Sequence, residues 1–249
     1  MTIIPGSHQL SGRAVRFLSA LILTLALLLL AAPAFGQQDY VARFDAYGGY
    51  AFLDSPHVSL FENGFAAQVG ARPRRWLSLG FDYSRTSGDL TLTPNLLLDS
   101  LQQSLGAQLT QMVAAHMIPA NYALVVPTHS VTQTFAAGPQ LAYRGMKHAT
   151  LFWRPVFAGI IHEVATPMPA DAIATAVVKQ LAPEGKKTDN VMFIGFGGGF
   201  DILLSKHIGW RTQADLVYDH LFNDMLKDAR FTVRFSAGPC FNFGGNVSK

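Results

Sequence analysis

The sequence is poor in charge. Aspartate, glutamate, lysine and arginine make up 14% of its 249 residues, against roughly 25% in ordinary soluble domains. The hydrophobic share of 49% is ordinary, so few polar side chains are left to cover a surface in contact with water. The formal net charge is only +3, and no lysine- or arginine-rich run is present. We therefore expect no nucleic-acid partner.

Cysteine and long apolar runs are also scarce. The one cysteine, Cys240, excludes an intrachain disulfide. The longest apolar run, 20–32, has 13 residues, short of the ~20 that a membrane-spanning helix needs. Any membrane insertion by the rest of the chain would have to use strands.

The N-terminus has the pattern of a secretory signal peptide. Arg13 and Arg16 precede the apolar run, and the small residues of APAFG follow it. We expect residues 1–36 to be a signal peptide cleaved after Gly36, with cleavage after Ala34 as the second choice. A retained N-terminal anchor is the alternative. Residues 37–249 would then form one exported domain.

Common site motifs are missing as well. The glycines of 195–199 lack a GxGxxG frame and a strand-then-helix context, which argues against a nucleotide site. The histidines show no metal-ligand spacing. We expect no cofactor and no metal. The best catalytic candidates are His57, Ser59 and Glu62, but they are weak because they follow Pro56 in an expected loop. Asp219-His220 is a similarly weak candidate.

What the sequence does contain is alternation of apolar and polar residues. It predicts eight strands, at roughly 41–52, 63–72, 76–87, 131–143, 150–163, 190–204, 209–222 and 229–243. Short connections alternate with long ones at 53–62, 88–130 and 164–189. This pattern and the even strand number predict an all-β, eight-stranded antiparallel up-and-down transmembrane β-barrel. Because proline donates no ladder hydrogen bond, we expect bulges at Pro139, Pro155 and Pro239.

Two long loops carry apolar residues at helical spacing. In 95–117 these are Leu97, Leu101, Leu105, Leu109 and Met112, which fall on one face of a helix. In 169–182 they are Ile173, Val177 and Leu181, with Pro169 suited to a first turn. We expect these faces to pack on each other or on the barrel rim. The alternative is a lid or a lipid-touching element.

Alternation alone does not say which face of the barrel is inside, since a soluble lipocalin-like barrel alternates too. The polar face carries arginine and aspartate rather than lysine and glutamate, which suits bidentate pairing in a confined space. It also carries the glycines of the sixth strand, which suit a crowded lumen. We therefore expect a charge network that plugs the lumen, formed by Arg43, Asp45, Asp82, Arg154, His162, Asp201, Arg211, Asp215, Asp219, Arg230 and Arg234.

The apolar face of the strands carries large aromatic residues near the strand ends, as in the aromatic girdles of membrane barrels. The residues expected to face lipid are Trp153, Trp210, Tyr218, Phe231, Phe235, Phe241 and Phe243. Trp76 and Tyr83 lie near the same boundaries. Cys240 should face the lumen, where it packs rather than takes part in redox chemistry.

Several stretches resemble one known family. DAYGGYAF (45–52), GPQLAYR (138–144), LFWRPVFAGIIHE (151–163), FGGGFDILLSKHIGWRTQADLVYDHL (196–221) and RFSAGPCFNF (234–243) resemble the small outer-membrane β-barrel proteins of the OmpA/opacity-like group. The resemblance implies residence in a Gram-negative outer membrane, with outer-membrane lipids around the barrel. It also implies insertion by the barrel-assembly machinery, with Phe243 as the insertion signal. The long loops depart from the family.

The sequence thus favours a non-enzymatic outer-membrane protein with a structural or surface-binding role, and we expect a monomer with its termini in the periplasm. Three alternatives stay open. They are a porin-like channel for small solutes, a lipid-modifying outer-membrane enzyme, and a soluble lipocalin-like binding barrel. The loops' extracellular ligand, the conductance of the lumen and the oligomeric state do not follow from the sequence.

Overall fold

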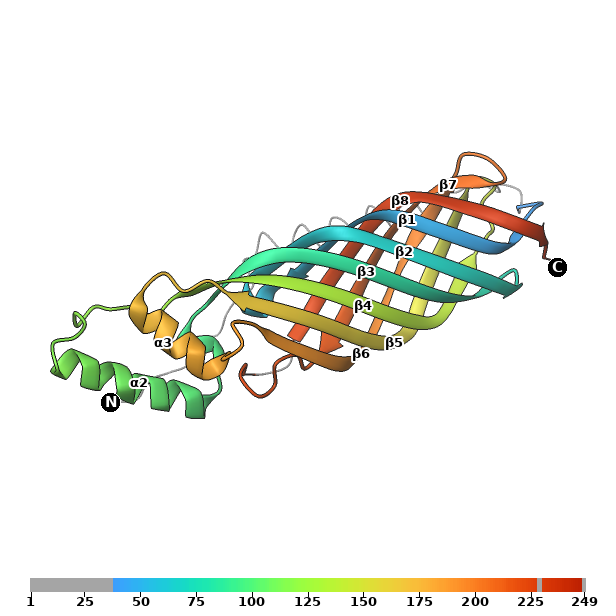
Figure 1. Cartoon of the computed structure of the whole chain (residues 1–249). Coiled ribbons are helices and arrows are strands. Elements are labelled where there is room, and N and C mark those ends of the chain that lie inside the picture. The colour runs from blue at the N-terminus through green and yellow to red at the C-terminus, as the bar shows by residue number, and fades with distance from the viewer. Residues whose placement is uncertain (1–37, 228–229, 248–249) are drawn as a thin grey trace, which may run out of the picture.

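The computed structural model describes residues 38–227 and 230–247. Within them, eight antiparallel strands form one closed barrel in chain order, and the last strand pairs with the first (Figure 1). The eight-stranded up-and-down fold expected from the sequence is confirmed. The expected signal peptide, residues 1–36, lies outside the described residues.

The strands are longer than the 9–11 residues that cross a bilayer, since they run from 12 to 19 residues. They are β1 (Ala42–Ser55), β2 (Leu60–Arg74), β3 (Leu77–Leu92), β4 (Val126–Tyr143), β5 (Ala149–Pro167), β6 (Lys187–Leu203), β7 (Ile208–Asp219) and β8 (Arg230–Asn246). The helical elements are η1 (Pro56–Val58), η2 (Pro94–Leu96), α2 (Asp99–Ala114) and α3 (Ala172–Leu181). In the part of the chain that the structure describes, no helix is long and apolar enough to cross a membrane.

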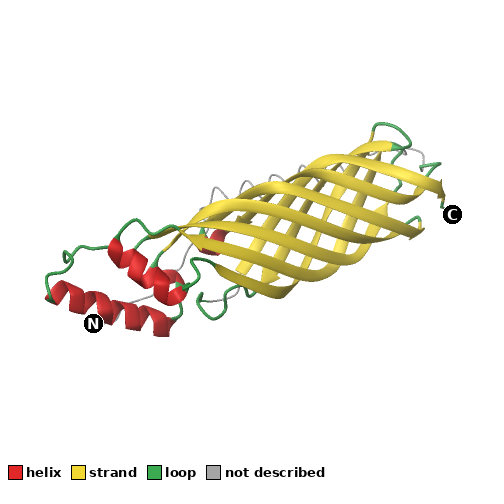
Figure 2. Cartoon of the chain, viewed as in Figure 1, coloured by secondary structure: helices red, strands yellow, loops and turns green. Residues whose placement is uncertain are grey.

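The two ends of the barrel differ, and we call them the turn end and the helix end. The turn end carries the three short connections, after β2, β4 and β6, together with the last described residues. The helix end carries η1, α2 and α3, which lie at the opposite end from the C-terminus (Figures 1 and 2). The long loops shrink to 93–125 and 168–186 because their flanking strands continue. The expected long loop at 53–62 is wrong, since β1 and β2 are joined by η1 and Ser59.

A bulge interrupts the alternation at one of the three strand prolines, Pro155. On β5, Arg154 to Phe157 pair with Gly197 to Gly195 of β6, and Trp153 to Ala158 pair with Leu141 to Ala137 of β4, so β5 has one residue more than either neighbour. Pro139 pairs with Leu79, and Pro239 with Trp210, in an unbroken register, so the bulges expected at Pro139 and Pro239 are wrong. The bulge at Pro155 reverses which residues of β5 face inward beyond it.

The two helices form where the sequence predicts them. Leu105 of α2 and Val177 of α3 belong to one buried apolar cluster with Leu90 and Val126 of the barrel rim. The expectation that the helices pack on the rim is confirmed. Asp171 caps α3 by accepting a bond from Ala174 N at 2.7 Å, so Pro169 lies before the cap and not in the first turn.

Candidate functional site

The outer surface of the barrel is apolar. Along β8, Phe231, Phe235, Phe241 and Phe243 are each 44–56% exposed, whereas the alternate residues of the strand are buried. Outward-facing apolar residues continue around the barrel, including Phe65, Val69, Leu79, Phe81, Phe135, Ile160, Met192, Ile194, Phe196 and Ile202. A monomer in water rarely exposes contiguous apolar patches above a few hundred Å². This exterior fits hydrocarbon.

The aromatic residues expected to face lipid all point out of the barrel. Trp153 is 58% exposed and Trp210 is 46% exposed. Tyr218 is half-exposed and packs against Phe231 with ring centroids 4.8 Å apart. Trp76, whose facing the sequence leaves open, is also exposed at the turn end.

The apolar surface ends before the strands do. On β3 to β6 the outward residues change to Arg85, Gln133, His162 and Asn190, which are successive Cα partners across the sheet. Further along, His129 Nδ1 and Asp89 Oδ1 lie 2.8 Å apart on the outer surface. These four strands therefore continue the barrel wall past the apolar belt at the helix end.

Inside the barrel, the charged side chains form three clusters of ion pairs. The turn-side cluster is centred on Arg211, whose Nε and Nη2 donate to the two carboxylate oxygens of Asp201 at 2.7 and 2.9 Å. Arg211 also lies 3.0 Å from Asp45, which pairs with Arg72 at 3.2 Å. Gln68 accepts a further bond from Arg211 at 2.6 Å. All four charged side chains are buried.

The central cluster joins two arginines to two aspartates. Arg154 lies 2.6 Å from Asp82 and 3.2 Å from Asp215. Arg234 lies 2.7 Å from Asp215 and 3.3 Å from Asp82. Each arginine thus touches both carboxylates. The Arg154 guanidinium also stacks over the Phe157 ring, 4.0 Å from its centroid, which fills the lumen beside the ion pairs.

The helix-side cluster contains Arg230, which lies 2.7 Å from Glu163 and 3.1 Å from Asp219. Glu62 is buried close by and accepts hydroxyl bonds from Thr86 at 2.7 Å and Thr132 at 2.9 Å. Within the described residues, Glu62 is the lumen carboxylate without a cation partner.

Two residues expected in the lumen network are not there. Arg43 is exposed and lies at the start of β1, where the pairing with β8 slips between Ala42 and Phe44. His162 faces outward and lies 2.6 Å from Asn190, because the bulge at Pro155 reverses the alternation and turns Glu163 inward. The other nine expected residues, Asp45, Asp82, Arg154, Asp201, Arg211, Asp215, Asp219, Arg230 and Arg234, are buried inside.

Sequence reasoning missed Arg72, Glu62 and Gln68. All three lie on β2 at even positions, on the inward face that the strand already showed. Gln68 and Arg72 lie within the expected strand, 63–72, and continuing the alternation by one residue would also have found Glu62. Glu163 could have been found only by counting the bulge at Pro155.

Glycines on β6 make room for the large side chains of the lumen. A Cβ on Gly195 would lie 2.6 Å from the Phe157 ring, and one on Gly197 would clash with Asp215 and the Ala214 carbonyl. The interior is therefore filled by side chains up to the glycine backbone. This is the packing expected of an eight-stranded barrel.

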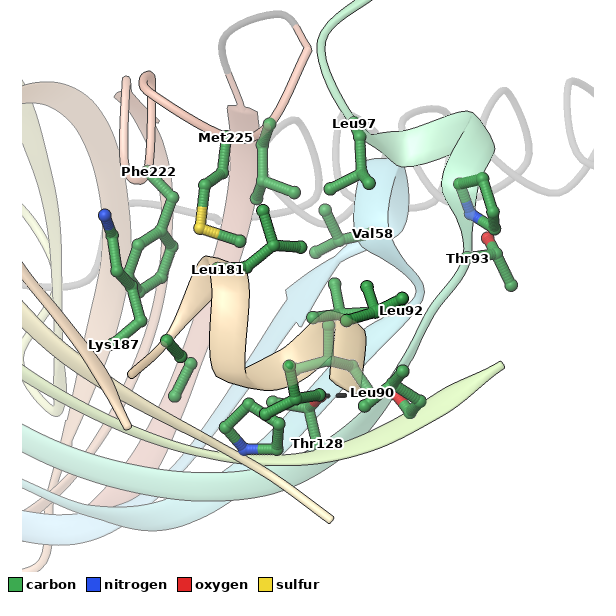
Figure 3. Close-up of a pocket in the computed structure, with 18 of the residues that line it drawn as sticks. Val58, Leu90, Leu92, Thr93, Leu97, Thr128, Leu181, Lys187, Phe222 and Met225 are labelled. Atoms are coloured by element: carbon green, nitrogen blue, oxygen red, sulfur yellow. Dashed lines mark hydrogen bonds between the residues drawn. The ribbon is translucent and has the colours of Figure 1, made fainter. Parts of the chain in front are cut away.

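A small apolar cavity of about 70 Å³ lies between the helices and the helix end of the barrel. Figure 3 shows Leu90, Leu97, Leu181 and Phe222 directed into this space from four different segments. Polar groups on its wall are already bonded, since Glu163 pairs with Arg230. The cavity is shaped for an apolar group rather than for a charged one.

We call residues 93–125, 168–186 and 220–227, which include η2, α2 and α3, the cap. Backbone bonds join its segments, with Leu98 N donating to Met225 O at 2.8 Å and Lys227 N to Leu96 O at 2.9 Å, and Met168 N donates to Pro127 O of β4 at 2.7 Å. Its ion pairs, Lys227 with Asp99 and Lys187 with Asp224, are largely exposed and are worth little. Apolar burial therefore holds most of the cap in place.

Two titratable groups of the cap and one of the turn end are shifted. The bond from Ala174 N, together with the Tyr122 hydroxyl, holds the pKa of Asp171 below its ordinary value. Burial and the neighbouring Asp171 raise the pKa of Tyr122. At the turn end, burial and the nearby Arg72 lower the pKa of Arg144 to about 10. None of these groups faces a catalytic partner.

The weak catalytic candidates are not assembled into a site. His57 lies 3.0 Å from the Lys227 carbonyl, Ser59 closes the η1 turn, and Glu62 faces the lumen. In the described part of the chain, no hydrogen bond joins these three residues. His220 is exposed, whereas Asp219 pairs with Arg230. No group of three or more His, Cys, Asp or Glu among the described residues could hold a metal ion.

Comparison with known proteins gives structural likeness only. No family model and no curated protein matches the chain. Among solved structures, the outer membrane protein OprG from Pseudomonas aeruginosa is similar at 10% identity and TM-score 0.48, covering 84% of this chain and all of that one. Ail, the attachment invasion locus protein of Yersinia pestis, in complex with the heparin analogue sucrose octasulfate, is similar at 12% identity and TM-score 0.45, covering 82% and 99%. Neisserial surface protein A is similar at 12% identity and TM-score 0.45, covering 80% and 96%.

Proposed function

We propose that the chain is an integral outer-membrane β-barrel protein without enzymatic activity, whose lumen is closed by ion pairs and whose cap is an extracellular binding element. The observation that carries the proposal is the inverted distribution of side chains. Phenylalanine and tryptophan cover the outside, whereas arginine and aspartate are buried inside. A soluble barrel such as a lipocalin needs the reverse arrangement.

The strands support a spanning role because a closed barrel satisfies every backbone group without water. The exposed aromatic residues lie where the barrel would meet the two membrane–water boundaries. The turn end would face the periplasm and the cap would face outside. Outer-membrane lipids and, during insertion, the barrel-assembly machinery are the proposed partners of a monomeric barrel.

The central cluster favours a plug over a channel. Arg154 and Arg234 are at most 4% exposed, and both bridge Asp82 and Asp215 across the lumen. An eight-stranded barrel is just wide enough to be filled by side chains. Conduction would require these ion pairs to break.

Planar-bilayer recording tests the plug. We expect the purified barrel to stay closed and Arg234→Ala to raise leakage, because it removes two of the contacts to Asp82 and Asp215. Lys179→Ala, an exposed change on α3, is the matched control and should leave the bilayer tight. Steady conductance of the unmodified barrel would favour the porin-like alternative.

The cap is the proposed binding element because it is the largest addition to the eight strands of the barrel and because it encloses the apolar cavity. Its ligand class would be a small apolar group, such as a short alkyl segment. A cavity of 70 Å³ holds roughly five water-sized groups.

Surface proteolysis of intact cells tests the orientation of the cap. Cuts should fall within 93–125 or 168–186 and spare the strands. Heat-dependent gel migration of the membrane fraction tests the barrel against the soluble alternative. An altered lipid profile on deletion of the gene would instead favour a lipid-modifying enzyme.

A further inference from the structure

The turn end of the barrel is basic. Arg43, Arg74, Lys147 and Lys206 are exposed and Arg75 is half-exposed. They come from the start of β1, the end of β2, and the turns after β2, β4 and β6, so they surround one rim of the barrel (Figure 1). In the described part of the chain, none of the five forms an ion pair.

Carboxylates are nearly missing from this rim. Asp45 and Asp201 lie just inside it, but both are buried in ion pairs with Arg72 and Arg211. Among the described residues, Asp39 is the one exposed carboxylate at this end. The five cations therefore keep nearly all of their charge for a partner outside the barrel.

The other end has the opposite balance. Its exposed or half-exposed described carboxylates outnumber its cations, with Asp54, Asp89, Asp99, Asp171, Glu184, Asp189 and Asp224 against Arg85, Lys179, Lys186, Lys187 and Lys227. The basic rim is thus a local feature of the turn end and does not merely reflect the net charge of the chain.

Aromatic residues next to these cations indicate the depth at which the cations lie in the membrane. Trp76 directly follows Arg75, and Phe44 directly follows Arg43. Trp76 is 58% exposed and Phe44 is 40% exposed. Aromatic side chains of membrane barrels lie at the boundary between hydrocarbon and water. The neighbouring guanidinium and ammonium groups then lie at the level of the lipid headgroups.

We propose that the turn end binds the headgroups of anionic phospholipids in the surrounding leaflet. Arginine matches phosphate with paired N–H donors, and lysine attracts it as a point charge. The rim of cations would select anionic over zwitterionic lipids. The inference rests on the barrel's insertion in a bilayer and goes beyond the proposed role of the cap.

The test uses the full mature chain in nanodiscs of phosphatidylcholine with a minor fraction of phosphatidylglycerol. Native mass spectrometry then counts the lipids that stay bound to the released barrel. We expect enrichment of phosphatidylglycerol over its share of the bilayer. The double variant Lys147→Gln, Lys206→Gln should lower that enrichment by about fivefold for each lysine, and higher salt should also lower it.

The matched control is Lys179→Gln, Lys186→Gln, which removes two exposed lysines from the cap and should leave the enrichment unchanged. Equal enrichment in the two double variants, or a larger loss in the cap variant, would overturn the inference. The inference would also be overturned if inorganic phosphate raised the melting temperature of the barrel in pure phosphatidylcholine as much as phosphatidylglycerol does. That result would indicate a site for free anions. Heat-dependent gel migration confirms that each variant is folded, so loss of lipid preference in a correctly inserted barrel leaves the proposed function intact.

Discussion

Asp215 is the residue on which the central cluster depends most. Its Oδ2 accepts from Arg234 Nη2 at 2.7 Å and from Gln213 at 2.7 Å, and it also lies 3.2 Å from Arg154 Nη1. Asp215→Asn keeps the shape but removes the negative charge. Arg154 and Arg234 would then share only Asp82. Leaving a buried charge without its partner costs about 3–5 kcal/mol, so we expect a loss of that size in the free energy of unfolding.

Urea unfolding in detergent micelles, followed by tryptophan fluorescence and heat-dependent gel migration, measures this loss. Asp224→Asn is the control, because it breaks the exposed pair with Lys187 and should cost less than about 1 kcal/mol. The double variant Asp215→Asn, Arg234→Gln should lose less than the sum of the single variants, because one orphaned cation is removed. If Asp215→Asn changed stability no more than Asp224→Asn does, the ion pairs would not organise the lumen.

Three further outcomes follow from the packing and the cap. Gly197→Ala should destabilise the barrel by about 1–3 kcal/mol because its Cβ has no space beside a buried aspartate. Gly106→Ala, in α2 with nothing within 4 Å, should instead stabilise the helix by about 0.5–1 kcal/mol; urea unfolding compares the two, and equal effects would contradict the packing. Because the folded pKa of Asp171 is depressed, its contribution to α3 is present above the ordinary aspartate pKa and is lost as the pH falls through the folded pKa. The amide resonance of Ala174 should follow this titration by NMR, and an Ala174 shift that persists in Asp171→Ala would refute the cap bond. Leu105→Ala should raise proteolysis within 93–125 without changing barrel unfolding, and unchanged cleavage would mean that apolar burial does not hold the cap.

Much of the barrel could be predicted because strand alternation is local. In β8, Arg234 and Phe235 point to opposite sides simply because they are neighbours in an extended chain. The same rule finds Asp215 and Trp210. The helix predictions succeeded for a similar reason, since the apolar spacing of α2 and α3 lies within each segment.

The failures come from features that alternation does not carry. A single extra residue at Pro155 exchanges the inward and outward faces, which is why His162 was expected inside and Glu163 was not. The pairing slip beside Arg43, where β8 holds the extra residue, is likewise invisible in the alternation of β1. The apolar cavity under the cap brings Leu90, Leu97 and Leu181 together from separate loops, and no spacing within one segment reveals such a meeting.

The central claim is that the apolar face meets hydrocarbon, and the tryptophans report on it directly. The chain has three tryptophans, and Trp76, Trp153 and Trp210 are all exposed on the outer surface. Tryptophan fluorescence of the barrel reconstituted in vesicles with brominated acyl chains should therefore be strongly quenched relative to unbrominated vesicles. The account would be contradicted if the tryptophan fluorescence were the same in brominated and unbrominated vesicles and the chain stayed dissolved without detergent.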